Sequence, residues 1–370
     1  MKSANCMDLL HRQPLFFPIS LKFSAQKKFV LPQKKLSPHQ KVLKWEGYLP
    51  KPILLLLFEP TTILVLNLPP DWHIVILTTF SKLTTSPPPF DAVAHDYDAA
   101  FTETAVGRLQ RELVWAFLKR LIDENPARSS VLEFNCGTGE DALWLAQQGC
   151  QVLATDISAQ MLAMTRRKVQ AAGLEESVAT EQLDLSAVER FIRENPFQSA
   201  SSTFHLILSN FGGLNCLSPV DLLRTGKHLP DLLAPDGYFV AVIMGRFCWQ
   251  ESLYFLLKGR WRTAFRRFSR KPVAARLDEQ TTVDTWYYSS REFRRFFPDL
   301  ELVALRPVGL WVPPSYLDTW FRRWPKFLHV LGWLERHCQG RFWAWGADHF
   351  LICLRPNSSH PQRESRRPPH

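Results

Sequence analysis

The sequence contains no C-x-x-C pair, no run of about 20 apolar residues and only one acidic residue among its first 45. The seven scattered cysteines therefore favour neither a disulfide framework nor a zinc ribbon, and they fit a reducing, cytoplasmic location. A membrane-spanning helix is not expected, because the hydrocarbon core requires about 20 consecutive apolar residues. The 370 residues are 46% hydrophobic and 22% charged, which provides material for a core and excludes a wholly disordered chain.

The net charge of +10 is unevenly distributed along the chain. Residues 1–85 carry 11 basic and 4 acidic side chains, residues 86–257 carry 13 and 21, and residues 258–276 carry 8 and none. Residues 277–354 balance, and residues 355–370 are basic again. A mildly acidic body is thus flanked by basic ends and interrupted by one basic segment. The overall charge therefore does not predict a nucleic-acid partner, and DNA is not expected.

Residues 1–89 differ in composition from the rest of the chain. Prolines recur through them, and the short apolar stretches 53–58 and 74–77 are separated by Pro60 and by the turn 69–71. The strongest apolar stretch lies too far from the N-terminus for a secretory signal. We expect a poorly ordered, basic and proline-rich extension that takes no part in the chemistry. The alternatives are a targeting segment or a sequence that is translated upstream of the true start.

A strand–turn–helix pattern begins the most informative part of the sequence. Residues 130–135 predict an apolar strand, Gly137 and Gly139 follow in a short turn, and a helix is predicted directly after them. Such a turn brings backbone amides close to a ligand at a helix N-terminus. The next strand, 151–156, ends in Asp156, and a carboxylate there can accept hydrogen bonds from both hydroxyls of a ribose.

Two kinds of cofactor fit this turn. Dinucleotide-binding proteins use G-x-G-x-x-G, and Ala142 is a permitted substitute at the third position, so a nicotinamide-dependent oxidoreductase stays open. Glu133, inside the strand before the glycines, would repel a pyrophosphate but can hold a cationic amino group indirectly. Asp184, after the next strand, suits an adenine amino group. Acids at three successive strand ends therefore favour a cationic amino-acid nucleoside over an anionic dinucleotide.

Together, the segments 131–139, 152–158 and 183–185 resemble the class I S-adenosylmethionine-dependent methyltransferases, and the resemblance extends over roughly residues 90–356. It implies an α/β, Rossmann-like fold with a seven-stranded, mostly parallel sheet, an antiparallel last strand and helical insertions that cover the acceptor side. It implies S-adenosyl-L-methionine as the cofactor. The implied activity is methyl transfer to a small or medium-sized acceptor, through an O-, N- or C-nucleophile that the resemblance does not specify.

The same resemblance assigns the site residues. The expected cofactor-binding residues are Tyr97, Glu133, Asn135, Gly137, Gly139, Asp156, Ile157, Asp184, Leu185 and Asn210. Asn135 stands where the family usually has its first glycine, and Tyr97 is expected to stack near the methionine part. The catalytic candidates are Asn210, at the end of the predicted strand 203–210, and His95; no metal site is expected. The alternatives are an ordinary strand-to-loop break at Asn210 and a surface or capping role for His95.

Two insertions, 246–288 and 307–347, interrupt the later part of the domain and contain most of the tryptophans. Within the first, residues 258–276 place aromatic side chains at helical spacing between arginines, which predicts a basic aromatic helix. Such a helix suits peripheral contact with a membrane, RNA or an acidic acceptor. The alternatives are a lid helix with inward aromatics and solvated arginines, or a chain that is a non-catalytic membrane- or RNA-binding module.

The second insertion predicts an amphipathic helix over Pro314–His337, with Trp320, Trp324, Leu328 and Leu331 on one stripe. Both insertions are expected to cover the substrate, with Tyr287 and Tyr288 at the edge of the pocket. We therefore predict one domain over residues 90–356, with its core at 128–245, followed by a basic disordered tail at 357–370. The sequence does not predict an oligomeric state.

Overall fold

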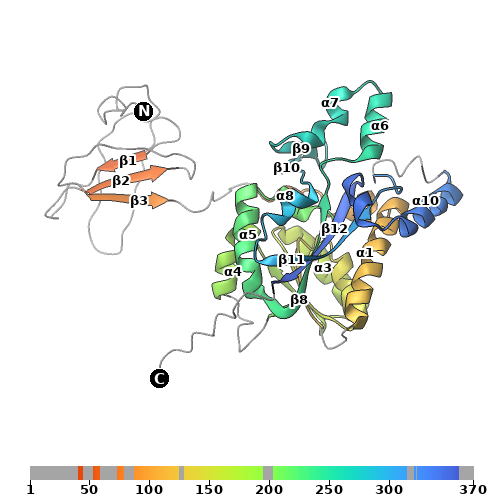
Figure 1. The fold of residues 1–370 in the computed structure, drawn as a ribbon. Helices are drawn as coiled ribbons and strands as arrows, with labels where there is room; N and C mark the ends of the chain where they lie inside the picture. The colour runs from red at the N-terminus through yellow and green to blue at the C-terminus, as the bar shows by residue number, and fades with distance from the viewer. Residues whose placement is uncertain are drawn as a thin grey trace. The chain divides into compact units, whose positions relative to one another are not determined.

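The computed structural model describes residues 41–44, 53–58, 73–78, 87–124, 129–194, 203–314, 321 and 323–357. The chain divides into two units, residues 1–86 and 87–370, whose relative positions are not determined (Figure 1). In the first unit, β1 (Lys41–Lys44), β2 (Ile53–Phe58) and β3 (His73–Thr78) form a sheet in which β2 pairs antiparallel with β1 and parallel with β3. The remainder of the expected extension and nearly all of the tail lie outside the described residues, so their disorder stays a prediction.

The second unit is built on a seven-stranded sheet with the order β11-β12-β8-β7-β4-β5-β6 (Figure 1). Its strands are β4 (Ser130–Phe134), β5 (Gln151–Asp156), β6 (Val178–Gln182), β7 (Phe204–Ser209), β8 (Leu233–Met244), β11 (Leu300–Val308) and β12 (His349–Pro356). Strands β8, β7, β4, β5 and β6 are parallel, whereas β12 runs antiparallel to both of its neighbours. The predicted Rossmann-like sheet with a reversed last strand is confirmed.

Helices cover both faces of this sheet. One apolar cluster joins the sheet to α1 (Ala105–Glu124), α2 (Glu140–Gln147) and α3 (Ala159–Ala172). A second cluster joins it to the helices α4 (Val188–Glu194), α5 (Pro219–Leu232) and α8 (Ser290–Arg294). The central strands β4, β5 and β7 are buried along most of their length because both faces are covered. The polar groups of the parallel strands are therefore concentrated at the carboxyl ends, where ligands bind in open α/β sheets.

The buried face of α1 is not the one that its apolar spacing favours. Apolar residues recur at Leu109 and Leu113, but these side chains are half-buried, and Val114 and Leu118 are fully buried. The buried face is rotated because α1 packs on two sides, against the sheet and against α10 (Pro325–His337), where Gly332 lies against Leu109. Polar residues of α1 are consequently buried with specific partners.

The predicted basic aromatic helix at 258–276 is wrong. The segment contains α7 (Trp261–Ala264), the 3-10 turn η6 (Arg266–Phe268) and β9 (Val273–Arg276), and it follows α6 (Trp249–Leu257). Gly259 adopts a left-handed φ of 68° between α6 and α7, and β9 pairs with β10 (Thr282–Thr285) in a hairpin. The sequence pattern has helical spacing, but the left-handed glycine and the hairpin interrupt it.

The predicted helix at Pro314–His337 is not continuous, because it is interrupted at Arg323 and Trp324. In the described residues α10 begins at Pro325, and proline favours the first turn of a helix because its missing N–H has no intrahelical partner there. Trp320 lies outside the described residues. On the predicted stripe Leu328 is buried, whereas Trp324 is more than half exposed. The 3-10 helix η8 (Arg341–Trp345) then leads into β12.

Candidate functional site

The turn after β4 follows a left-handed path at the carboxyl end of the central strand. Asn135, Gly137 and Gly139 have positive φ values of 54°, 54° and 82°. Asparagine is one of the few residues besides glycine that tolerates this region. A Cβ on Gly139 would lie 2.5 Å from the side chain of Thr165, so the close packing of the turn on α3 requires glycine there.

The carboxylate of Asp156 fixes this turn to the end of β5. Its Oδ2 accepts a hydrogen bond from the backbone N–H of Gly137 at 2.9 Å, and its Oδ1 accepts one from Ser158 at 2.8 Å. Burial raises the pKa of Asp156, although these N–H donors act in the opposite direction. The residue that was predicted to bind a ribose thus also shapes the loop beside it.

Glu133 is a fully buried acid that forms no ion pair with any described residue. Its side chain is 1% exposed, and its Oε2 has no hydrogen-bond partner among the described residues. Burial, and secondarily the nearby Asp141, raises the pKa of Glu133 well above its usual value. An unpartnered buried carboxyl group next to a glycine turn is a place where a cationic group would be stabilised.

A cover segment, residues 89–104, crosses the glycine turn and the start of α3; it contains η2 (Pro89–Asp91) and η3 (Asp98–Thr102). Asp91 accepts a hydrogen bond from the hydroxyl of Ser158. Asp98 accepts one from Thr138 Oγ1 at 2.6 Å and forms an ion pair with Lys168 at 2.7 Å. These contacts close the cover segment over the site.

Tyr97 lies on this cover segment above the glycine turn. Its Cε1 is 4.0 Å from the position that a Cβ of Gly137 would occupy, and its ring contacts Phe90 and Phe101. Burial raises the pKa of Tyr97 to about 12, so its hydroxyl stays protonated at neutral pH. The structure therefore brings Tyr97, Glu133, Asp156 and the turn together.

A buried ion pair on the same side of the sheet is absent from the sequence prediction. Arg111 Nη1 lies 2.5 Å from Asp141 Oδ2, and Asp141 also accepts hydrogen bonds from Trp115 Nε1 at 2.6 Å and Asn210 Nδ2 at 2.9 Å. Burial alone would lower the pKa of Arg111, but Asp141 outweighs it, so the pKa is raised. The guanidinium also lies 5.1 Å from the ring centre of Phe211.

Asn210, the predicted catalytic residue, uses both of its side-chain polar atoms inside the protein. Its Nδ2 donates to Asp141, and its Oδ1 accepts from the backbone N–H of Phe211 at 3.0 Å. Phe211 has a φ of 45°, which is a strained conformation for a bulky residue. Contacts of its ring with Phe101 and His349 hold it there. The arrangement fits a positioning role for Asn210, and its catalytic role stays a prediction.

The other predicted site residues lie at the ends of β5 and β6 or outside the site. Asp184 is exposed and accepts a hydrogen bond from Ser186 at 2.8 Å, Leu185 is buried, and Ile157 is 38% exposed. His95 is 90% exposed at its side chain and contacts Asp96, so the structure does not bring it to the other site residues. Its catalytic role stays a prediction.

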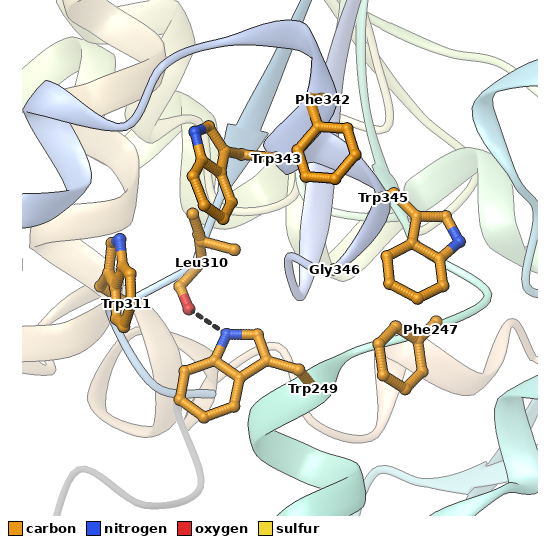
Figure 2. Close-up of a pocket in the computed structure, with 8 residues that line it drawn as sticks. All are labelled: Phe247, Trp249, Leu310, Trp311, Phe342, Trp343, Trp345 and Gly346. Carbon is orange, nitrogen blue, oxygen red and sulfur yellow. Dashed lines mark hydrogen bonds between the residues drawn. The ribbon is translucent and has the colours of Figure 1, made fainter.

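An aromatic pocket lies in the two insertions (Figure 2). It has a volume of about 430 Å³ and is lined by Phe247, Trp249, Leu310, Trp311, Phe342, Trp343, Trp345 and Gly346. The indole N–H of Trp249 donates to the carbonyl of Leu310 at 2.7 Å and is thereby satisfied within the wall. The two predicted edge residues, Tyr287 and Tyr288, are buried and do not line this pocket.

A short segment connects the pocket to the cofactor side of the sheet. Gly346 lines the pocket, and His349, three residues later, contacts the ring of Phe211 at 5.8 Å between ring centres. Within the described parts of the chain, no group of three His, Cys, Asp or Glu side chains is arranged for a metal ion. No described helix combines the length and the apolar character that crossing a bilayer requires.

Residues 131–237 match the family model of a methyltransferase domain. The tRNA 5-carboxymethoxyuridine methyltransferase of Escherichia coli K12 is 30% identical over 90 residues, which cover 24% of this chain and 34% of that protein. The malonyl-[acyl-carrier protein] O-methyltransferase of Enterobacter lignolyticus is 32% identical over 179 residues, which cover 48% of this chain and 59% of that protein. The chain thus spans about a third to three-fifths of the length of these relatives.

Among solved structures, a complex titled DhpI-SAM-HEP is 18% identical with a TM-score of 0.44, over 72% of this chain and 94% of that one. The CcbJ methyltransferase from Streptomyces caelestis is 15% identical with a TM-score of 0.40, over 74% and 92%. The family match falls on the strand-turn-helix and the carboxylate strand ends described above. The part of the chain that contains the glycine turn and the strand-end carboxylates is thus similar to a methyltransferase domain.

Proposed function

We propose that residues 87–357 catalyse methyl transfer from S-adenosylmethionine to a small or medium-sized acceptor. The observation that carries the proposal is Glu133, a buried carboxyl group with an unpartnered oxygen beside a left-handed glycine turn. A cationic amino group satisfies such a carboxyl, whereas a pyrophosphate would be repelled. This favours the methyl donor over a nicotinamide dinucleotide.

The chain's own residues hold the cofactor in this proposal. Glu133 faces its amino group, directly or through water, and Tyr97 covers its methionine part. Asp156 binds the ribose hydroxyls, while Ile157, Asp184 and Leu185 surround the adenine. The cofactor, when bound, supplies a methyl group already activated by its sulfonium.

The protein then has to hold the acceptor nucleophile in line and exclude water, with a base where the acceptor requires one. We propose that Asn210 acts here through Phe211, whose strained backbone it fixes. The aromatic pocket, connected to Phe211 through His349, supports an acceptor with an apolar part. We also propose a cytoplasmic location, which the six unpaired cysteines among the described residues support.

Substitution of Asp156 tests the cofactor site. Asp156→Ala removes a proposed ribose acceptor and releases the turn at Gly137, so we expect the dissociation constant for S-adenosylmethionine to rise at least about tenfold in calorimetry. Glu175→Ala is the matched control, because this exposed acid lies before the amino end of β6, whereas Asp156 lies at the carboxyl end of the parallel strand β5. No binding by the unaltered protein, an indifferent Asp156, or displacement of the cofactor by NAD would contradict the proposal.

The acceptor can be identified without knowing its structure. The protein is incubated with a cell extract and S-adenosylmethionine that carries an isotopically labelled methyl group, and mass spectrometry detects the labelled product. The Asp156→Ala variant provides the background. Label that appears with the unaltered protein and not with the variant identifies the acceptor and the methylated atom.

A further inference from the structure

An exposed apolar surface extends over parts of both insertions; we call it the aromatic face. It consists of Leu253, Leu257, Trp261, Phe265, Phe268, Phe342, Trp343 and Trp345, which are all more than 40% exposed. The exposed fraction reaches 81% at Leu257 and 78% at Phe342. Single exposed apolar residues are ordinary, but a contiguous group of this size marks an interaction surface.

Ring contacts make this face continuous. Phe265 contacts Phe268 at 6.1 Å between ring centres, Phe268 contacts Phe247 at 6.0 Å, and Phe247 contacts Trp345 at 4.7 Å. Phe247 and Trp345 also line the aromatic pocket, where they face each other (Figure 2). The two insertions therefore form one surface, and the pocket lies within it.

The face is built on a rigid base. Arg267 is buried and bonds Glu251 Oε2 at 2.7 Å and Asp348 Oδ1 at 2.6 Å, which joins the first insertion to the start of β12. The hydroxyl of Ser252 on α6 donates to the carbonyl of Ala264 on α7 at 2.9 Å. In Figure 1, α6 and α7 project beyond the sheet with the β9–β10 hairpin. The aromatic side chains are thus presented outward by an anchored scaffold.

The segment that carries the first part of the face bears positive charge only. Residues 252–277 contain no acidic side chain. Arg260, Arg262, Arg270 and Lys271 are exposed, and within the described part of the chain no ion pair involves them. The arginines of this segment are therefore divided between the buried network, where Arg267 lies, and the outer rim of the aromatic face.

We propose that the aromatic face docks on a membrane surface that contains anionic lipids. Tryptophan side chains are favoured at the boundary between lipid headgroups and acyl chains, and basic residues beside them attract anionic headgroups. The exposed leucines of α6 suit acyl chains but offer no ring on which a nucleic-acid base can stack. A second copy of the chain would bring two positive rims together, which opposes self-association.

Binding of the full chain to vesicles tests this inference. We expect it to sediment with vesicles of phosphatidylcholine and phosphatidylglycerol, and not with phosphatidylcholine alone. Replacing both Trp261 and Phe265 by Ser should weaken the partition coefficient about tenfold or more, because apolar area no longer inserts. Arg262→Gln and Arg270→Gln should each weaken it about fivefold, and added salt should act in the same direction.

The matched control is Val220→Ser on α5, which removes an apolar side chain that is 66% exposed away from the face. Circular dichroism and calorimetric cofactor binding should be unchanged in every variant, which separates failure here from failure of the proposed methyl transfer. Equal loss in the Val220 variant or no preference for anionic vesicles would overturn the inference. The inference would also be overturned if the protein formed a dimer that dissociates when Trp261 and Phe265 are replaced. The same holds if it bound single-stranded RNA and not vesicles.

Discussion

At the scale of single residues, the cofactor side of the site contains buried carboxyl groups, and the burial of a charged carboxylate is energetically unfavourable. Glu133, Asp141 and Asp156 are all buried within a short distance along two neighbouring strands and a helix start. Asp141 has Arg111 as its counter-charge, and Asp156 accepts two backbone hydrogen bonds. Only Glu133 among the three combines burial with an oxygen that no described group satisfies, so it is the one that a bound cation would most stabilise.

Glu133→Gln should separate the effect of this carboxyl group on stability from its effect on cofactor binding. The raised pKa of Glu133 means that the folded protein holds this proton more tightly than the unfolded chain does. Stability therefore falls as the pH rises above the ordinary glutamate value, and the fall continues up to the raised pKa. We expect the Gln variant, which cannot ionise, to gain thermal stability relative to the unaltered protein at pH 8 and to differ little at pH 4.

Cofactor binding by the same variant should change in the opposite direction. A cationic amino group favours the ionised carboxyl, so binding to the unaltered protein should strengthen with rising pH, and the Gln variant should bind more weakly and lose this dependence. Thermal melts and calorimetry across the pH range measure both effects, with Glu175→Gln as an exposed control. A variant that is less stable at pH 8 and binds normally would show that Glu133 is charged and paired in the free protein.

At this scale the polar residues at the strand ends could be predicted from the sequence, whereas the buried ion pair of Arg111 and Asp141 could not. Glu133, Asp156 and the glycines follow apolar strands at fixed spacing, so the pattern itself indicates their place. Arg111 and Asp141 carry no such signal: the first lies in an amphipathic helix, and the second resembles an ordinary acid in the first turn of a helix. Their pairing depends on how α1 packs against α2, which a local pattern does not contain.

At the scale of elements, the strands and helices of the core could be predicted from the sequence better than the elements of the insertions. The central strands are short, nearly continuous apolar runs and the core helices repeat apolar residues at a period of 3.6, and the structure places them within a few residues of the prediction. Ser289 and Glu292, three residues apart as a capping box requires, form one at the start of α8. The first insertion contradicts its predicted helix, because Arg267 is fixed by Glu251 and Asp348 and leaves Trp261 and Phe265 outside.

Arg267→Leu tests whether this buried network holds the first insertion in place. The substitution leaves Glu251 and Asp348 buried without their shared guanidinium, so we expect the free energy of unfolding to fall by about 3–5 kcal/mol. Urea denaturation measures the change. Arg262→Leu, five residues away and exposed, should cost less than about 1 kcal/mol. Similar losses from both substitutions would show that Arg267 contributes through its charge alone and not through its buried contacts.

At the scale of the whole molecule, the net charge of +10 does not describe the body that carries the chemistry. Residues 1–86 carry 11 basic and 4 acidic side chains, and residues 258–276, part of which form the rim of the aromatic face, carry 8 and none, whereas acids outnumber bases in residues 87–257. The cofactor side lies in the acidic part of the chain, as suits a cationic ligand. Composition predicted this separation correctly, but only the fold shows which arginines are buried and which are exposed.

Removing residues 1–86 tests this division of the molecule. Among the described residues, the apolar clusters of the second unit are formed by residues from Ala105 onward, and each unit is compact by itself. We expect a chain that begins at Pro87 to keep its unfolding transition and to bind S-adenosylmethionine within about twofold of the full chain. If the aromatic face carries membrane binding, the shortened chain also keeps its preference for anionic vesicles and loses it when Trp261 and Phe265 are replaced. If truncation abolishes vesicle binding, the lysines of the first unit attract the anionic lipids. If truncation abolishes cofactor binding, the first unit completes the cofactor site.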